Sequence, residues 1–287
     1  GKQPAPADIA SADFDVVIGE VLGALKRYAS SSDILAVGHR IVHGGTRFAE
    51  PQIMTPEVVA ELARLTPLAP QHQPYGLRIA AAAREEWPTA IQVAAFDTAF
   101  HRSTPKIEQL FALPLKFAEE GILRYGFHGL SYEYIASVAP AILGSMARRV
   151  IVAHLGHGCS LCAMLDGKSV ATTMGFTALD GLPMATRVGA IDPGVLLHLL
   201  KERGLSIAEL ERCLYEESGL LGVSGISGDV RALEASEDPR AAEALDYFAY
   251  RIAREVGALT VALGGLDALV FTAGIGENSQ GVRARVM

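Results

Sequence analysis

Residues 151–173 read IVAHLGHGCSLCAMLDGKSVATT, and this stretch predicts three short strands in succession. The strands are expected over 151–153, 160–165 and 169–173, where apolar and β-branched residues gather between turn residues. The pair Asp166-Gly167, between the second and third strands, is a strong signal for a tight β-hairpin turn. We therefore expect at least these two strands to pair antiparallel.

Strands and helices are predicted to alternate in the rest of the chain. Apolar runs and helical spacing predict strands over 34–37, 91–96 and 268–271, and helices over 14–28, 55–65, 76–86 and 239–263. Further helices are expected to begin at Ser131, at Asp192-Pro193 and at Ser206, because such residues cap helix starts. Hairpin strands combined with this alternation indicate an α/β fold, with a mixed sheet flanked by helices.

The composition is that of a globular protein large enough for two domains. Half of its 287 residues are hydrophobic, and the formal net charge of −7 argues against nucleic acid or an anionic membrane as a partner. No apolar run approaches the roughly 20 residues of a membrane span, and the first residues lack the apolar core of a signal peptide. We expect a cytoplasmic protein.

The three cysteines do not form a metal or disulfide pattern. Cys159 and Cys162 have no second pair to complete a zinc site, and on a strand they would point to opposite faces.

Two arginines stand beside glycines in a way that suits anion binding. Arg40 belongs to the stretch GHRIVHGG, residues 38–45, and Arg187 to PMATRVG, residues 183–189. A guanidinium offers a fixed fork of donors to carboxylate or phosphate, and glycine lets the backbone come close to the same anion. A structural pairing of Arg40 with a buried acid, and a surface ion pair for Arg187, remain open at this stage.

Two glycine-bearing turns after strands could cradle phosphates. They are Gly156-His157-Gly158 and Gly274-Ile275-Gly276, and neither matches the common nucleotide-binding fingerprints. Backbone N–H groups in such turns can hold phosphate oxygens, although glycine turns also occur for steric reasons alone.

Other candidate residues are polar side chains at turns. His128, between two glycines in RYGFHGLS (residues 124–131), could donate to a transferring phosphoryl group or bond a backbone carbonyl. Asp97 follows an apolar strand and could orient a metal-bound phosphate or cap a turn. Asp229 and Arg231 flank a turn that could contact a nucleotide or simply lie in a surface loop.

Eight motifs in this order and spacing resemble the acetate kinase family. They are GHRIVHGG, FDTAFH, RYGFHG, HLGHGCS, GKSVATTMGFT, MATR, SGISGDVR and FTAGIGENS, and they extend from about Ile34 to the end of the chain. The resemblance implies the two-domain fold of acetate and sugar kinases, Hsp70 and actin, with domains over 1–99 on the carboxylate side and 100–287 on the nucleotide side. It also implies ATP/ADP and Mg²⁺ as cofactors and a homodimer.

The activity implied by this resemblance is reversible, ATP-dependent phosphorylation of a short carboxylate, acetate above all, to an acyl phosphate. By the same resemblance Arg40 and Arg187 would hold the carboxylate and the phosphoryl group, His128 would stabilise the transition state, and Asp97 would be catalytic. The residues implied along the nucleotide are His154, Gly156, His157, Gly158, Asp229, Val230, Arg231, Gly274, Ile275, Gly276 and Asn278.

The chain departs from the family pattern at side chains of both subsites. His157 stands where the family has asparagine. The acyl pocket of the family offers valine, leucine, phenylalanine and proline, and the matching residues here are Val42, Gln71, Phe127 and Ala178. The smaller alanine and the polar glutamine predict a preference for a larger or more polar acid, such as propionate or a hydroxy acid.

Two family segments have no match in this sequence. Nothing before Gly38 resembles the family's first strand and phosphate-binding serine turn, and the glutamate expected to serve the magnesium ion would lie beyond Met287. We therefore expect this exact polypeptide to be inactive or poorly folded.

Two other classes of protein were weighed against a carboxylate kinase. A non-catalytic relative that binds nucleotide is the alternative, supported by His157 and the unmatched segments. A sugar or glycerol kinase is disfavoured, because it needs an aspartate base to deprotonate a hydroxyl, whereas a carboxylate is already a nucleophile at pH 7.

Overall fold

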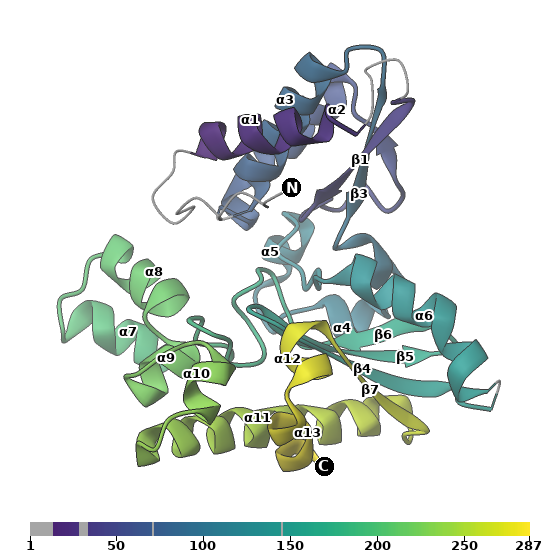
Figure 1. Cartoon of the computed structure of the whole chain (residues 1–287). Helices are drawn as coiled ribbons and strands as arrows, with labels where there is room; N and C mark the ends of the chain where they lie inside the picture. The colour runs from purple at the N-terminus through teal and green to yellow at the C-terminus, as the bar shows by residue number, and fades with distance from the viewer. Residues whose placement is uncertain (1–13, 29–33, 71, 145) are drawn as a thin grey trace. The chain divides into compact units, whose positions relative to one another are not determined.

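The computed structural model describes residues 14–28, 34–70, 72–144 and 146–287, which form two compact units (Figure 1). Unit 1 comprises residues 1–44 and 50–96, and unit 2 comprises 45–49 and 97–287. The sequence-based domain boundary, between residues 99 and 100, stays a prediction. Among the described residues, no helix has the length and apolar character needed to cross a bilayer.

Unit 1 is a small mixed sheet with helices packed against it. Its strands are β1 (Ala36–Ile41), β2 (Gln52–Ile53) and β3 (Ile91–Phe96), in the order β1-β3-β2, with β1 parallel and β2 antiparallel to β3. Its helices are α1 (Phe14–Leu25), α2 (Pro56–Arg64), the 3₁₀ helix η2 (Thr66–Leu68) and α3 (Gln73–Glu86). The sheet and its helices meet at buried Trp87, which belongs to a hydrophobic cluster that includes Leu22 of α1 and Val37 of β1.

Strand β1 differs from its prediction. It was expected over 34–37, but it begins at Ala36 and continues through Gly38, His39 and Arg40. The reason is tertiary, because every residue from Ala36 to Ile41 has a partner in the parallel ladder with β3. Arg40 therefore lies in a strand rather than in the loop that follows it.

Unit 2 is built on a four-stranded mixed sheet in the order β6-β5-β4-β7. Its strands are β4 (Arg149–Leu155), β5 (Cys159–Leu165), β6 (Lys168–Thr172) and β7 (Ala268–Thr272). The ladders β4/β5 and β5/β6 are antiparallel, and β4/β7 is parallel. Asp166 and Gly167 both adopt positive φ, 50° and 75°, as a type I′ turn requires, so the predicted hairpin is confirmed.

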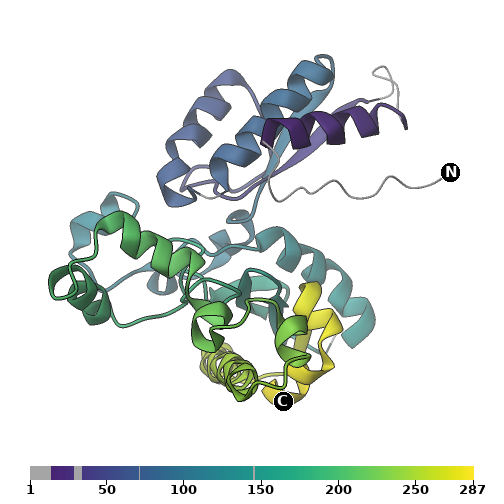
Figure 2. The same cartoon turned by 60° about the vertical axis from the view of Figure 1, so that its left-hand side comes forward.

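Two long helices lie on opposite sides of this sheet (Figures 1 and 2). Helix α6 (Gly129–Leu143) packs Tyr132 against Val150, Val152, Cys162 and Met164, which share one face. Helix α11 (Pro239–Leu263) contacts β4, β5 and β6 from the other side. With both faces covered, the residues of β4 and β5 are buried almost throughout rather than alternating between buried and exposed.

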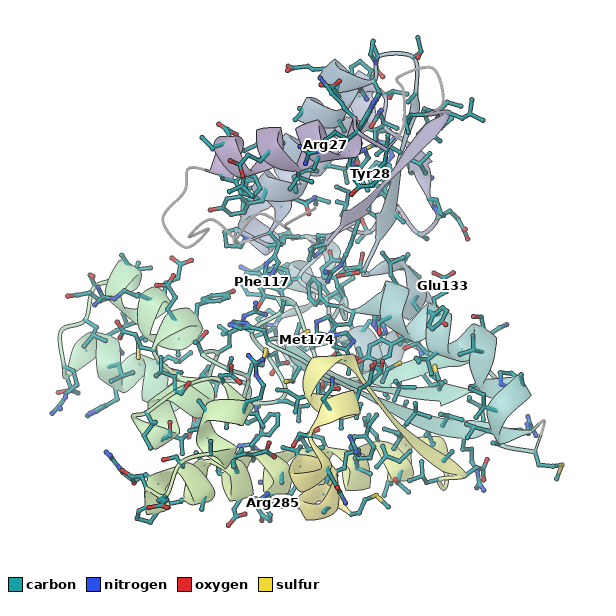
Figure 3. All side chains as sticks on the ribbon, viewed as in Figure 1. Arg27, Tyr28, Phe117, Glu133, Met174 and Arg285 are labelled. Carbon is teal, nitrogen blue, oxygen red and sulfur yellow. The ribbon has the colours of Figure 1, made fainter. Side chains whose placement is uncertain are left out.

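The other helices of unit 2 are short and surround this core. They are η3 (Ala99–Ser103), α4 (Lys106–Gln109), α5 (Leu115–Glu119), α7 (Pro193–Lys201), α8 (Ile207–Glu216), α9 (Gly219–Ser224), α10 (Val230–Glu234), α12 (Ala273–Asn278) and α13 (Gln280–Val286). Figure 3 shows the side chains between these elements, and Met174 is fully buried among them. The predicted caps are confirmed, because Asp192 accepts from the N–H of Gly194, and Ser206 forms a capping box with Glu209.

Several predicted boundaries differ from the structure, and helix α1, for example, ends at Leu25 rather than near Tyr28. The stretch Gly274–Gly276 is not an open turn but lies within helix α12. Helix α6 begins at Gly129 rather than Ser131, and α3 begins at Gln73 rather than Gly76. Helix ends differ from such predictions by a turn or less, because they depend on local backbone hydrogen bonds that the sequence pattern does not indicate.

We expect Leu161→Ala in β5 to lower the free energy of unfolding by about 2–5 kcal/mol, because it empties a fully buried site. The matched control is Leu165→Ala on the same strand, where the side chain is 38% exposed and the loss should be about 0.5 kcal/mol. Urea denaturation of both variants measures the difference. Equal losses would contradict the position of Leu161 in the core.

Candidate functional site

Arg187 is a buried charge without a balancing carboxylate. Arg187 belongs to the loop over residues 183–189, and it is only 8% exposed. Its Nη1 donates to the carbonyl oxygen of Ala178 at 3.2 Å, and no carboxylate of the described residues forms an ion pair with it. Burial lowers the pKa of Arg187 from its usual value, although a guanidinium stays protonated. The surface ion pair considered for Arg187 is wrong, and a buried cation of this kind suits an incoming anion.

Close backbone contacts fix the loop that carries Arg187. Gly219 has φ of 62°, and a Cβ there would lie 2.1 Å from the carbonyl oxygen of Met184 and 2.8 Å from that of Arg187. The N–H of Leu220 donates to Met184, and that of Met184 donates to the carbonyl of Arg187. A side chain at position 219 would therefore push the loop away, and glycine is required there.

His128 is held against Asp97 by a second close approach. It adopts φ of 60° just before α6, and the N–H of the next residue, Gly129, donates to the carbonyl oxygen of Asp97 at 2.8 Å. A Cβ on Gly129 would lie 2.2 Å from that oxygen. Asp97 itself is 1% exposed, directly after strand β3. The two predicted catalytic residues are therefore neighbours.

The turn at Gly158 brings His128 and Arg187 together. A Cβ built on Gly158 would lie 3.3 Å from Nε2 of His128 and 3.6 Å from Nη1 of Arg187. The same turn is tight, since the N–H of Gly156 donates to the carbonyl of Gly158. Two nitrogen groups suited to a phosphoryl oxygen thus face one glycine, with no side chain between them.

His154, at the end of β4, stacks on His128. The ring centroids are 4.1 Å apart and the ring planes 20° apart. Nδ1 of His154 hydrogen-bonds the hydroxyl of Ser131 at 2.9 Å. His154 therefore limits the movement of the His128 ring.

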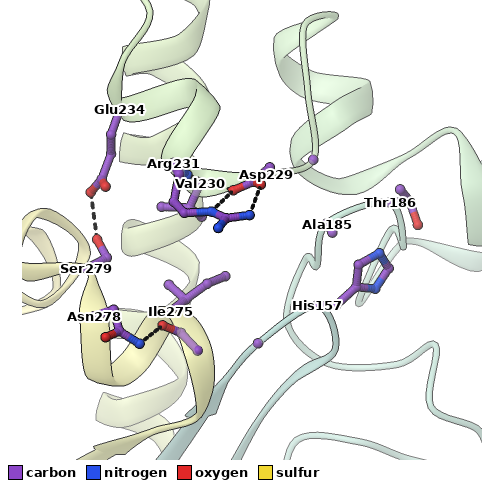
Figure 4. Close-up of a pocket in the computed structure, with 13 residues that line it drawn as sticks. His157, Ala185, Thr186, Asp229, Val230, Arg231, Glu234, Ile275, Asn278 and Ser279 are labelled. Atoms are coloured by element: carbon purple, nitrogen blue, oxygen red, sulfur yellow. Dashed lines mark hydrogen bonds and ion pairs between the residues drawn. The ribbon is translucent and has the colours of Figure 1, made fainter. Parts of the chain in front are cut away.

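A pocket of about 790 Å³ lies beside this cluster in unit 2 (Figure 4). Its walls come from the turn after β4, the loop of Arg187, and helices α10 and α12. Eight of its lining residues were predicted at the nucleotide: Gly156, His157, Asp229, Val230, Arg231, Gly274, Ile275 and Asn278. In Figure 4, His157 and Thr186 lie across the pocket from Ile275 and Asn278.

Two charged residues of the pocket, Asp229 and Arg231, are paired with each other. Arg231 donates to both carboxylate oxygens of Asp229, at 3.1 and 2.6 Å, and Asp229 also caps α10. The hydrogen bonds from Arg231 lower the pKa of Asp229 to about 2. Glu234 accepts from the hydroxyl of Ser279 at 2.6 Å. The pocket wall is thus polar, and the charges of Asp229 and Arg231 balance each other.

Three predicted nucleotide residues do not line the pocket. His154 stacks on His128, and Gly158 faces His128 and Arg187. Gly276 packs against the backbone of Phe271 and Ala153. The acyl-pocket candidate Phe127 is 1% exposed, and its carbonyl accepts from His101, while Ala178 contacts Arg187.

The remaining candidates belong to unit 1 or lie outside the described residues. Arg40 is exposed on β1, and Val42 is half-buried directly after it. Gln71 lies outside the described residues. The convergence of Arg40 and Arg187 on one anion stays a prediction.

Sequence analysis missed five pocket residues. They are Ala185, Thr186, Gly228, Glu234 and Ser279. Four of them belong to the motifs MATR, SGISGDVR and FTAGIGENS, so the motifs themselves carried the signal. Glu234 lies three residues after Arg231 in α10, on the same helical face, which only an assigned helix could have indicated.

The comparisons with known proteins point to one family. The sequence matches the model of the Acetokinase family over residues 1–287. It is 53% identical to the acetate kinase of Rhodopseudomonas palustris (strain TIE-1) over 274 residues, which cover 95% of this chain and 69% of that protein. The chain belongs to the acetokinase family.

Solved structures of acetokinase relatives have the same fold. The Porphyromonas gingivalis acetate kinase matches with a TM-score of 0.87 at 40% identity, covering 96% of this chain and 71% of that one. A propionate kinase from Francisella tularensis subsp. tularensis SCHU S4 matches with a TM-score of 0.88 at 37% identity, covering 96% and 72%. The predicted resemblance to this family and the predicted α/β fold of its members are confirmed.

Buried His101 anchors the segment before His128. Its ring is 2% exposed, bonds the carbonyl of Phe127 through Nε2 at 2.9 Å, and bonds the hydroxyl of Ser169 through Nδ1 at 2.8 Å. Burial lowers the pKa of His101 to about 4, with the bond to Phe127 opposing the shift. The folded protein therefore keeps this ring neutral while the unfolded chain takes up a proton near pH 6.5.

We expect His101 to make the protein less stable in mild acid. Above about pH 6.5 the ring is neutral in both the folded and the unfolded chain, and His101 costs no stability. As the pH falls from 6.5 toward 4, only the unfolded chain takes up the proton, and the free energy of unfolding falls by about 3 kcal/mol in total. Urea denaturation at pH 7 and pH 4.5 measures the slope, which should be smaller in His101→Gln. Exposed His198→Gln should keep the wild-type slope. An unchanged slope in His101→Gln would rule out this source of acid sensitivity.

Proposed function

We propose that the protein catalyses reversible, ATP-dependent phosphorylation of acetate to acetyl phosphate by direct in-line transfer. Membership of the acetokinase family supports this activity, and so do curated acetate kinases such as that of R. palustris. The observation that carries it is the buried Arg187, without a carboxylate among the described residues and beside His128 at the Gly158 turn.

The pocket supports ATP or ADP as the nucleotide. Its volume of about 790 Å³ falls within the ordinary range for small-molecule sites, roughly 300–1,000 Å³. The Gly156–Gly158 turn joins the pocket to the His128 and Arg187 pair. A nucleotide in the pocket would therefore extend its phosphates along this turn toward the two nitrogen groups.

Phosphoryl transfer requires positioned charged and polar groups more than covalent chemistry, and Arg187 and His128 would supply such groups. The guanidinium of Arg187 and Nε2 of His128 would donate to the equatorial oxygens of the phosphoryl group in the transition state. Arg40 would hold the acceptor carboxylate. Because a carboxylate is ionised at pH 7, no general base is needed to activate it.

Asp97 is suited to hold Mg²⁺ beside the phosphates. The described residues contain no group of three His, Cys, Asp or Glu side chains that could bind a metal ion by themselves. Mg²⁺ is commonly held by one or two carboxylates together with substrate phosphates, so a single buried carboxylate beside the His128 segment fits that role. The ion would neutralise charge on the β- and γ-phosphate oxygens.

The same proposal includes a homodimer and a cytoplasmic location, both expected from the family resemblance. The alternative, a non-catalytic relative that binds nucleotide, would form no acyl phosphate. Trapping with hydroxylamine as a hydroxamate separates the two, since only the kinase yields the trapped product from ATP and acetate.

We expect Arg187→Met to lower turnover about 10²- to 10³-fold, because one donor to the transition state is lost. Methionine keeps most of the volume and removes an unbalanced buried charge, so thermal stability should not fall. The hydroxamate assay measures the rate, and Arg212→Ala, an exposed arginine paired with Glu217, is the control. A stable Arg187→Met protein with full turnover would overturn the role of Arg187.

The second candidate is a kinase for a larger or more polar acid, favoured by Ala178 beside Arg187. This second candidate predicts a higher kcat/KM for propionate or a hydroxy acid than for acetate, because alanine leaves more room than proline. Ala178→Pro should shift the preference toward acetate. A clearly higher kcat/KM for acetate in the unaltered protein would reject this second candidate and favour acetate as the substrate.

A further inference from the structure

A chain of buried hydroxyls stands behind His128, on the ring nitrogen opposite the site. Nδ1 of His128 lies 2.7 Å from the hydroxyl oxygen of Ser160, and this oxygen lies 2.5 Å from the hydroxyl of Tyr132. Ser160 and Tyr132 are both 0% exposed. Ser160 comes from β5 and Tyr132 from α6, so the sheet and the helix that covers it each supply one member.

We propose that Ser160 and Tyr132 are positioning residues, which keep the proton of the neutral His128 ring on Nε2, the nitrogen that faces Gly158 and Arg187. The geometry of the hydrogen bonds carries this inference, and its catalytic consequence rests on the proposed phosphoryl transfer.

Counting donors and acceptors fixes the direction of the chain. Within the described part of the chain, the hydroxyl of Tyr132 has one partner, Ser160, and the hydroxyl of Ser160 has two, Tyr132 and His128. If Tyr132 donates to Ser160 and Ser160 donates to Nδ1, every buried proton has an acceptor. Nδ1 is then an acceptor without a proton, and in a neutral imidazole the proton must lie on Nε2.

Both other arrangements leave a buried donor without an acceptor. If Nδ1 carried the proton and Ser160 donated to Tyr132, the hydroxyl proton of Tyr132 would have no acceptor. If both Nδ1 and Tyr132 donated to Ser160, the proton of Ser160 would have none. An unsatisfied buried donor is costly, so both arrangements are disfavoured.

The surroundings of Tyr132 keep it a donor. Its ring is enclosed by Val150, Val152, Cys162 and Met164, and burial raises its pKa well above the ordinary value. The phenol therefore stays protonated at any pH at which the protein would work.

The proton on Nε2 matters because this nitrogen faces the site. A Cβ on Gly158 would lie 3.3 Å from it. With Nε2–H the ring can donate to an oxygen of the transferring group, whereas with Nδ1–H it would present a lone pair to a negative charge. The hydroxyl chain thus selects the form of His128 that attracts the phosphoryl oxygens.

The test is the protonation state of each ring nitrogen in the free protein, by NMR with ¹⁵N-labelled histidine. His128→Asn assigns the signals of His128. We expect a protonated Nε2 and an unprotonated Nδ1 in the unaltered protein. In Ser160→Ala the constraint is lost, and a population with protonated Nδ1 should appear. Protonated Nδ1 in the unaltered protein, or no change in Ser160→Ala, would overturn the proposal.

Turnover of acetate and ATP gives the second measurement. We expect Ser160→Ala to lower kcat about 3- to 10-fold with the KM for ATP unchanged, because neither hydroxyl lines the pocket. The double variant Ser160→Ala/Tyr132→Phe leaves no buried hydroxyl without a partner, so a failure to fold is not a concern there. It should show the same loss of kcat. Wild-type kcat in the double variant would overturn the proposal.

Matched controls come from the exposed face of the same helix. Tyr134→Phe and Ser137→Ala make the same chemical changes on exposed residues of α6 and should alter neither measurement. The two proposals fail separately. If the unaltered protein forms no acyl phosphate, the proposed function fails, while the NMR measurement still decides whether the hydroxyl chain sets the His128 proton.

Discussion

The chemistry proposed for unit 2 depends on keeping the Arg187 guanidinium buried with no carboxylate of the described residues beside it. Removing a charge from water without a counter-ion is unfavourable, so this position persists only because the surrounding backbone leaves it no other place. Gly219 closes on the loop at Met184 and Arg187, and any side chain there would open it. The unfavourable burial becomes useful once an anion arrives, because the ion pair then forms between partners that are already ordered.

The same construction repeats at His128, where Gly129 lies against the carbonyl of Asp97. In both places a glycine lets two backbone segments, far apart in the sequence, touch directly. Asp97 directly follows strand β3 and the Gly158 turn directly follows β4, so both lie at strand ends, where open α/β sheets bind their ligands. Direct contacts between backbone segments therefore hold the site residues in place, and such contacts allow less movement than a side chain on a surface loop does.

What the sequence predicted well was local. The Asp166-Gly167 hairpin, the caps at Asp192 and Ser206, and the long helix over 239–263 follow from neighbouring residues, and all are present. What it missed depends on distant partners: β1 extends because β3 pairs with it, and the burial of Arg187 follows from Gly219. At the site, motifs predicted most pocket residues, but nothing in the pattern indicated that Ser160 and Tyr132 stand behind His128.

The pocket and the transfer region differ in how their charges are satisfied, and this difference determines what each can contribute. Asp229 and Arg231 already neutralise each other at the pocket wall, so a nucleotide there gains shape and polar contacts but little new ion pairing. Arg187 has no carboxylate partner among the residues that the structure describes, so it would gain an ion pair from a negative group beside Gly158. Interactions that strengthen only as charge develops raise kcat rather than ground-state affinity. In the proposed reaction, this separation of paired from unpaired charge would direct the electrostatic contact of Arg187 to the phosphoryl group rather than to the nucleoside.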